Sequence, residues 1–140
     1  MTRSMTQVDD GSVASIRLRL APADARYAGG IAAGSKMMEI FADVETELSL
    51  LEGGDEGLCA GYDSVEFLEP LKVGDFVEAT GRVVARGRTS RRIEIELWRV
   101  VSVDERGIRV PDDKPVLAGR ATVTVVVGKT VASVAASVTE

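Results

Sequence analysis

The sequence predicts an α+β domain in which an antiparallel sheet wraps around one long helix. Three observations support this fold class. Only the segment from Gly34 to about Leu51 keeps apolar residues at helical spacing over a long stretch. The part of the chain after this segment is dominated by runs rich in Val, Ile, Phe and Thr, which favour strands. One strand-like run precedes the helix, so the predicted order is strand, helix and four antiparallel strands.

The region before the helix is predicted to contain a tail, a strand and a glycine-containing turn. Residues 1–14 are polar and lack periodicity, and we expect them to form a disordered tail. From Ile16 to Leu20 apolar and basic residues alternate, as in a half-buried strand. The segment Asp24 to Ile31 contains Gly29 and Gly30 and is expected to open the helix. A glycine-opened helix start is a binding site for anions and carbonyl oxygens.

The predicted helix has an apolar face and a charged face. The charged face carries Lys36, Glu39, Asp43 and Glu47. Asp43 and Glu47 are one turn apart, which suits an acid–base pair, although a solvated helix face is the commoner reason for charges at this spacing. Glu45 lies at the edge of the apolar stripe, where an ion pair with an arginine of a neighbouring strand or subunit is the favoured interpretation.

Four strands are predicted after a loop at residues 52–57, and their ranges are 58–68, 75–86, 90–102 and 118–127. Residues 104–115 are predicted to be a polar connection, and residues 129–140 a frayed tail. One domain therefore spans residues 15–128. A sheet of this kind leaves edge strands and an uncovered rim, so we expect a homodimer or a dimer-based higher oligomer.

The composition of the chain excludes several classes of function. The 140 residues carry a net charge of −5, which argues against partnership with nucleic acid or a membrane surface. A cytoplasmic location is expected, since the sequence shows no signal peptide and no membrane span. There is no histidine and no metal-ligand cluster, so acid–base chemistry falls to carboxylates, tyrosine or lysine. Cys59 has no identifiable partner to lower its pKa and is interpreted as a buried thiol in a strand.

Several motifs occur in the order found in a known superfamily. These motifs are Asp24–Tyr27 with Gly29-Gly30, Asp43-Val44 with Thr46-Glu47-Leu48, Tyr62–Phe67, Pro70 with Gly74-Asp75, and Gly87–Arg91. Through them, residues 15–128 resemble the hotdog-fold superfamily of acyl-CoA enzymes. Within that superfamily the chain is most similar to the 3-aminobutyryl-CoA ammonia-lyases of lysine fermentation and to the β-alanyl-CoA ammonia-lyases. The resemblance implies a hotdog fold, an antiparallel sheet wrapped around a central helix.

The resemblance also implies an activity and a set of site residues. The activity is the reversible elimination of ammonia from 3-aminobutyryl-CoA, or a similar 3-aminoacyl-CoA, to give crotonyl-CoA or a related 2-enoyl-CoA. CoA is part of the substrate, so no cofactor is expected. Asp43 would act as the base, Glu47 would attract the substrate ammonium, and Tyr27 would donate a hydrogen bond or relay a proton.

The resemblance implies contacts with the substrate from residues that come before and after the predicted helix in the sequence. Backbone N–H groups of Gly30 and Ile31 would polarise the thioester carbonyl. The full set of implied substrate and CoA contacts is Asp24, Gly29, Gly30, Ile31, Tyr62, Asp63, Gly87, Arg88, Thr89, Ser90 and Arg91.

Alternatives remain for individual residues and for the activity. Asp63 is expected to point inward, where it either orients a catalytic group or caps the helix. The arginines around Gly87 either bind CoA phosphates or form a solvated turn. The lyases have histidine in place of Arg26 and a small residue in place of Glu45, which puts in doubt any step that needs that histidine. The competing functions are an acyl-CoA thioesterase and a non-enzymatic acyl-CoA-binding module.

Overall fold

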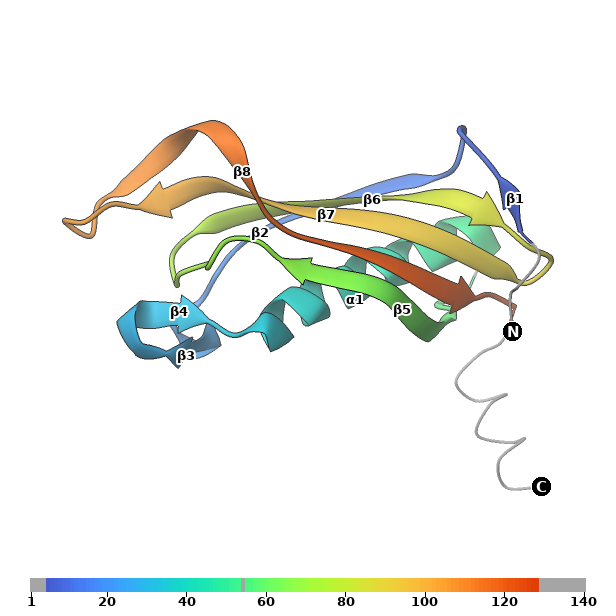
Figure 1. Cartoon of the computed structure of the whole chain (residues 1–140), viewed down its shortest axis with the longest axis horizontal. Coiled ribbons are helices and arrows are strands. Elements are labelled where there is room, and N and C mark those ends of the chain that lie inside the picture. The colour runs from blue at the N-terminus through green and yellow to red at the C-terminus, as the bar shows by residue number, and fades with distance from the viewer. Residues whose placement is uncertain (1–4, 54, 129–140) are drawn as a thin grey trace, which may run out of the picture.

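A curved antiparallel sheet packs against one long helix in the computed structural model, which describes residues 5–53 and 55–128 (Figure 1). The helix is α1 (Gly34–Gly53), and the strand order in the sheet is β1-β6-β7-β8-β5, with β2 also paired to β6. The α+β fold class is therefore confirmed. The six strands are β1 (Thr6–Gln7), β2 (Val13–Arg19), β5 (Leu58–Phe67), β6 (Phe76–Arg86), β7 (Ser90–Val103) and β8 (Arg109–Val126).

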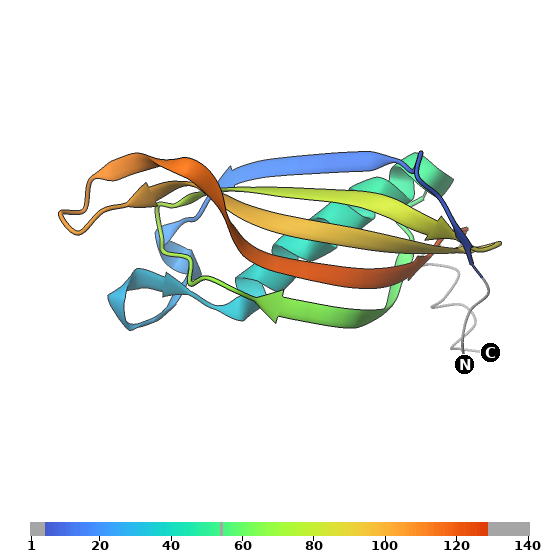
Figure 2. The same ribbon diagram turned by 45° about the horizontal axis from the view of Figure 1, so that its top comes forward.

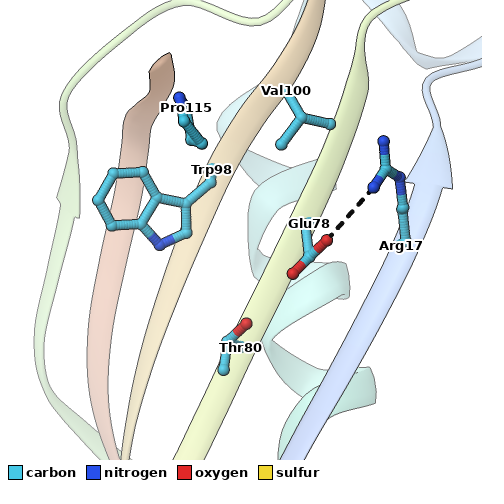
Figure 3. Close-up of a pocket in the computed structure, with 6 residues that line it drawn as sticks. All are labelled: Arg17, Glu78, Thr80, Trp98, Val100 and Pro115. Atoms are coloured by element: carbon cyan, nitrogen blue, oxygen red, sulfur yellow. Dashed lines mark ion pairs between the residues drawn. The ribbon is translucent and has the colours of Figure 1, made fainter.

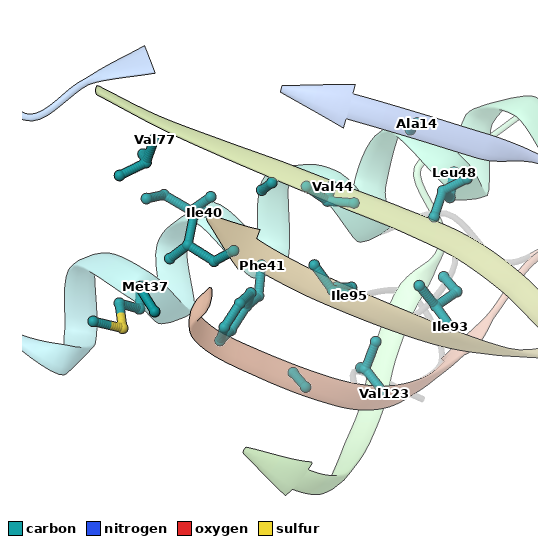
Figure 4. Packing of buried hydrophobic residues seen from close by; sticks show 14 of the residues in the cluster. Ala14, Met37, Ile40, Phe41, Val44, Leu48, Val77, Ile93, Ile95 and Val123 are labelled. Carbon is teal, nitrogen blue, oxygen red and sulfur yellow. The ribbon is translucent and has the colours of Figure 1, made fainter. Parts of the chain in front are cut away.

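The core lies between α1 and the concave face of the sheet. The helix side chains Phe41, Val44 and Leu48 are fully buried, and they pack with inward-facing residues such as Ile93 and Ile95 of β7 (Figure 4). Burial of a large aliphatic or aromatic side chain contributes about 1.5–3 kcal/mol. The predicted apolar stripe of the helix is thus the face that the sheet covers.

The N-terminal region differs from the predicted tail. Thr6 and Gln7 pair with Arg86 and Ala85 of β6, and β2 begins at Val13. Ala14 is buried in the core. The prediction of a tail is therefore wrong for residues 5–14. Their polarity arises because β1 and β2 form an edge of the sheet that is largely exposed. Residues 1–4, the rest of the predicted disordered tail, and residues 129–140, predicted to be a frayed tail, lie outside the described residues.

The predicted polar connection at residues 104–115 is largely a strand. β8 begins at Arg109, and its first residues pair with the end of β7 to form a two-stranded arm, residues 101–111, that extends past the rest of the sheet (Figures 1 and 2). The Arg99 guanidinium holds the Asp112 carboxylate at the base of the arm through two contacts of 3.2 Å. The loop prediction failed because pairing with β7 satisfies the backbone N–H and C=O groups of this segment, so it forms a strand although its polar side chains stay largely exposed.

The two ends of the molecule carry different features. At the amino end of α1 lie the two-stranded hairpin of β3 (Ala25–Tyr27) and β4 (Ile31–Ala32), the connection from β5 to β6, and the arm (Figure 1). At the carboxyl end of α1 lies the turn from β6 to β7 at residues 87–89. A helix of 20 residues is roughly 30 Å long, so these two ends are about that far apart within one chain.

Candidate functional site

The Gly29-Gly30 segment forms the tip of a hairpin and not the start of the helix. Both glycines have positive φ, 79° and 74°, a conformation that side chains disfavour, and they turn β3 back into β4. The carbonyl of Gly30 accepts a hydrogen bond from Val73 N–H at 2.9 Å, and Ala32 N–H donates to Leu71 O at 2.8 Å. The prediction that Gly30 and Ile31 open the helix is therefore wrong. The helix begins only at Gly34, after β4 has paired.

Asp24 fastens this hairpin to the first turn of α1. Its carboxylate accepts a hydrogen bond from Ala21 N–H at 2.7 Å and lies 3.5 Å from the Lys36 ammonium. Arg26 bends back to donate to the carbonyls of Ala23 and Ala25. Asp24 thus has a structural role at the place where a substrate contact is predicted. Tyr27 projects from the same hairpin with 61% of its surface exposed.

The predicted catalytic pair lies on the outer face of α1. Asp43 and Glu47 are both exposed, as are Glu39 and Leu50 on the same face. The sequence predicted their shared face correctly, but in a single chain this face is in contact with solvent. Two neighbouring carboxylates acquire different proton affinities when they share a site from which water is excluded. A single chain does not provide such a site for Asp43 and Glu47.

Glu45 is the buried carboxylate of the helix. Only 7% of its surface is exposed, and its Oε2 atom has no hydrogen-bond partner. Burial raises the pKa of Glu45 to about 7, and a hydrogen bond with Tyr62 of β5 partly offsets this rise. Burial and the nearby Glu45 charge also raise the pKa of Tyr62. No ion pair between Glu45 and an arginine forms among the described residues, so the interpretation is wrong for a neighbouring strand of the same chain, and an ion pair with a neighbouring subunit stays a prediction.

Two irregularities in edge strand β5 decide which of its side chains face the helix. The register with β8 shifts between Cys59 and Gly61 and again between Tyr62 and Ser64, as expected for β-bulges. As a result Tyr62 is half-buried against the core, whereas Asp63 points outward and lies 3.6 Å from Arg92. Cys59 is exposed. The predictions of an inward Asp63 and a buried Cys59 are therefore wrong, because strict alternation along a strand does not survive a bulge.

The arginines of the β6–β7 turn are mostly engaged within the protein. Arg86 binds both carboxylate oxygens of Glu52 at 2.9 and 2.7 Å and thereby, as the leading cause, lowers the pKa of Glu52 to about 2. Arg91 donates to the carbonyls of Gly87 and Ser90 and lies 3.5 Å from Glu52. These contacts join the end of α1 to the turn. Arg91 is therefore held within the chain, its predicted contact with CoA stays a prediction, and the side chains left open to solvent at the turn are those of Arg88 and Thr89.

A groove crosses the sheet face that is turned away from α1 (Figure 3). It has a volume of about 570 Å³. An ion pair of 3.6 Å between Arg17 and Glu78 closes one side, and Trp98 forms the other (Figure 3). The groove lies on the opposite face of the sheet from the helix, so it is separate from the predicted site.

The comparisons with known proteins agree with this architecture. Residues 29–103 match the family described as the thioesterase superfamily. The chain belongs to this superfamily. Over 86 residues it is 41% identical to the 3-aminobutyryl-CoA ammonia lyase of Acetoanaerobium sticklandii, a match that covers 61% of this chain and 68% of the relative.

Two solved structures extend the comparison to the whole fold. The β-alanyl-CoA:ammonia lyase of Clostridium propionicum superimposes with a TM-score of 0.80 at 32% identity, over 85% of this chain and 87% of the other. A hexameric hotdog-fold thioesterase of Campylobacter jejuni superimposes with a TM-score of 0.70 at 22% identity, over 81% of each chain, and supports the fold alone. The predicted hotdog fold is confirmed.

Two other classes of feature are absent from the described parts of the chain. Within residues 5–53 and 55–128, no three side chains of the His, Cys, Asp or Glu type gather closely enough to hold a metal ion. In the same ranges, no helix has the length and apolar character needed to cross a membrane.

Proposed function

We propose that this protein is a carbon–nitrogen lyase that eliminates ammonia from 3-aminobutyryl-CoA, or a similar 3-aminoacyl-CoA, to give the 2-enoyl-CoA. The observation that carries the proposal is the likeness to two ammonia lyases, one by sequence at 41% identity and one by structure at a TM-score of 0.80. Both relatives are named for the same reaction class on CoA thioesters. The solved thioesterase structures that share the fold are more distant, at 21–25% identity, and the 49% identity to an uncharacterized acyl-CoA thioester hydrolase of Zymomonas mobilis extends over only 39 residues.

The chemistry needs a base near carbon 2 of the acyl group. The thioester acidifies the hydrogen on carbon 2, a carboxylate removes it, and the C3–N bond then breaks as its electron pair leaves with ammonia. The proton on the base finally passes to solvent or to the released ammonia, so the reaction requires no cofactor. In this proposal Asp43 is the base, Glu47 attracts the substrate ammonium, and Tyr27 donates a hydrogen bond.

A second copy of the chain is needed to complete this site. The outer face of α1 and the neighbouring edge strand β5 are both open, and within residues 5–53 and 55–128 β5 pairs only with β8. Apolar side chains lie exposed along this side, with Leu50 at 48% and Phe67 at 53%. A second copy that covers β5 and α1 would exclude water from Asp43 and Glu47, and desolvation then raises the proton affinity of a carboxylate. The hexameric state named for the Campylobacter jejuni thioesterase supports assembly of this fold.

Glu45 is the alternative base that the structure brings forward. The Glu45 side chain is already buried from solvent in a single chain, and a carboxylate with a pKa near 7 is well matched to proton transfer at neutral pH. The resemblance supports Asp43 instead, since it implies a small residue at position 45 in the lyases. Asp43→Asn and Glu45→Gln distinguish the two, because loss of a general base lowers turnover by about 10²–10⁴-fold.

The decisive assay follows three products after addition of 3-aminobutyryl-CoA to the purified protein. We expect the absorbance of an enoyl thioester to appear together with ammonia, and a thiol reagent to detect no free CoA. Release of free CoA from several acyl-CoAs, without an enoyl product, would assign the protein to the thioesterases. Binding of CoA thioesters without any turnover would instead identify an acyl-CoA-binding module.

A further inference from the structure

The hairpin of β3 and β4 carries several residues that are predicted to act on the substrate, yet it buries little of its own surface. Tyr27, Gly29, Gly30 and Ile31 all lie on it, and Ala32 is the only buried residue of its two strands. A two-stranded hairpin by itself is at best marginally stable in water. Its position must therefore be fixed by the segments that it contacts.

The connection between β5 and β6 acts as a third strand beside this hairpin. Two backbone hydrogen bonds, of 2.8 and 2.9 Å, join residues 71–73 to residues 30–32. Between them, Ile31 and Lys72 form an antiparallel bridge. One of the two bonds runs from Val73 N–H to the carbonyl of Gly30, at the tip of the hairpin. The position of the tip therefore depends on the position of the connection.

Asp75 closes the connection into a fixed turn. Its Oδ2 atom accepts a hydrogen bond from Lys72 N–H at 2.8 Å, and its own N–H donates to Lys72 O at 3.1 Å. Gly74, inside the turn, has a φ of 90°, which glycine adopts without strain. The carbonyl of Asp75 also accepts Leu20 N–H at 2.9 Å, just after β2. The carboxylate thus holds Lys72, the residue that is bridged to β4.

The Asp75 carboxylate is buried, and one of its oxygens is unpaired. Only 1% of the residue is exposed, and Oδ1 has no hydrogen-bond partner among the described residues. Burial raises the pKa of Asp75, while the hydrogen bond from Lys72 and the charge of Arg99 in β7 partly offset this rise. Burial of a polar oxygen without a hydrogen bond costs free energy. The gain from this side chain therefore lies in the turn that it holds and not in its burial.

The same turn also contacts the arm. The position that a Cβ atom would take at Gly74 is 3.1 Å from Nη2 of Arg109 and 3.4 Å from Cγ2 of Val103. Arg99, whose charge acts on Asp75, also binds Asp112 at the base of the arm. Asp75 thus lies where β2, the arm and the connection to the hairpin meet.

We propose that Asp75 is a positioning residue whose carboxylate, by closing the turn at residues 72–75, holds the hairpin where Gly30 and Ile31 are predicted to contact the thioester. The proposal rests on the proposed function for its substrate. Without the carboxylate, Lys72 N–H loses its partner and residues 71–73 are free to move away from β4. The backbone N–H groups of Gly30 and Ile31 then lose their fixed place. Because fixed donors act mainly on the charge that develops in the transition state, kcat should fall more than KM rises.

The first measurement is amide hydrogen exchange of the folded protein without substrate, in the wild type, Asp75→Ala and Asp75→Asn. In Asp75→Ala we expect residues 27–32 to exchange about 10-fold faster, the effect of about one lost hydrogen bond, while β7 keeps its protection. Asp75→Asn keeps an oxygen that accepts Lys72 N–H and should recover most of the protection. Asp75→Ser, with a shorter acceptor, replaces Asp75→Ala if the latter does not fold.

Asp55→Ala is the matched control. The Asp55 carboxylate also accepts a backbone N–H, that of Gly57 at 2.8 Å, but in the loop that follows the carboxyl end of α1. This variant should leave exchange in residues 27–32 unchanged. The second measurement is the rate of ammonia release from 3-aminobutyryl-CoA. We expect kcat to fall by about 10- to 100-fold in Asp75→Ala, with a smaller change in KM, and to recover in Asp75→Asn.

Three outcomes overturn the proposal. Equal acceleration of exchange in the hairpin and in β7 would show that Asp75 only stabilises the whole fold. Unchanged exchange in the hairpin would show that the turn does not hold it. Faster exchange in the hairpin with an unchanged kcat would remove the positioning role. If the wild type releases no ammonia while the hairpin loosens in Asp75→Ala alone, the proposed reaction fails and the structural link from Asp75 to the hairpin stands.

Discussion

Glu45 is the residue at which burial and charge are most strongly opposed. Its position at the edge of the apolar stripe was visible in the sequence, and that position is the signal that it would be buried. The sequence could not show that Tyr62 and not an arginine would face it, because that pairing depends on the bulges of β5. Asp63 and Cys59 were misplaced for the same reason.

The raised pKa of Glu45 makes stability depend on pH. The pKa of Glu45 rises from 4.5 to about 7 on folding, so its contribution to the free energy of unfolding is complete below pH 4.5 and is lost as pH increases through 7. Glu45→Gln removes this pH-dependent loss. Between pH 5 and pH 8 the free energy of unfolding of the variant should therefore increase by up to about 3 kcal/mol relative to that of the wild type. Urea unfolding of both proteins at these two pH values measures the change. A difference that stays constant with pH would contradict the assignment.

At the scale of elements, the long helix and the four later strands could be predicted because their apolar residues repeat at the period of the element. The short elements could not be predicted in this way. β1, β3, β4 and the arm contain few buried side chains, and they exist because of the strands that they pair with. The glycines at residues 29 and 30 signalled a turn, but composition does not distinguish a hairpin tip from a helix start.

The contact between α1 and β6 depends on a glycine. A Cβ atom at Gly81 would lie 2.6 Å from Cγ1 of Val44, so the helix can approach the sheet only because that atom is missing. Gly81→Ala should lower the free energy of unfolding by about 1–3 kcal/mol through overpacking. Gly61→Ala is the control, since no heavy atom lies within 4 Å of its Cβ position. Thermal unfolding compares the two, and equal melting temperatures would contradict this packing.

At the scale of the whole molecule, the outer face of α1 and the β5 edge are open in the described residues of a single chain, which fits the proposed second copy. The sequence predicted an oligomer from the presence of edge strands, and the structure adds which edge and which face are open. The location of the acidic pair could be predicted from helical periodicity. Its environment could not be predicted, because in the proposed assembly the residues that cover it belong to another chain.

Assembly should therefore depend on the outer face of α1. Leu50→Glu places a charge on this face and should reduce the mass measured by light scattering toward that of a single 14.9 kDa chain. Ile108→Glu, at an equally exposed position near the tip of the arm, should leave the mass unchanged. Activity should fall with the assembly, because Asp43 would return to water. An unchanged mass for Leu50→Glu would remove the proposed interface.

The central claim is that a carboxylate of α1 removes a proton from carbon 2 of a CoA thioester. Hydrogen exchange at that carbon tests it most directly: butyryl-CoA, which carries no amine to eliminate, is incubated with the protein in D₂O and analysed by mass spectrometry. We predict deuterium at carbon 2 with the wild type and a rate lower by about 10²–10⁴-fold with Asp43→Asn. An unchanged exchange rate in Asp43→Asn together with a lower rate in Glu45→Gln would assign the base to Glu45 instead of Asp43. Absence of exchange with the wild type would contradict the account.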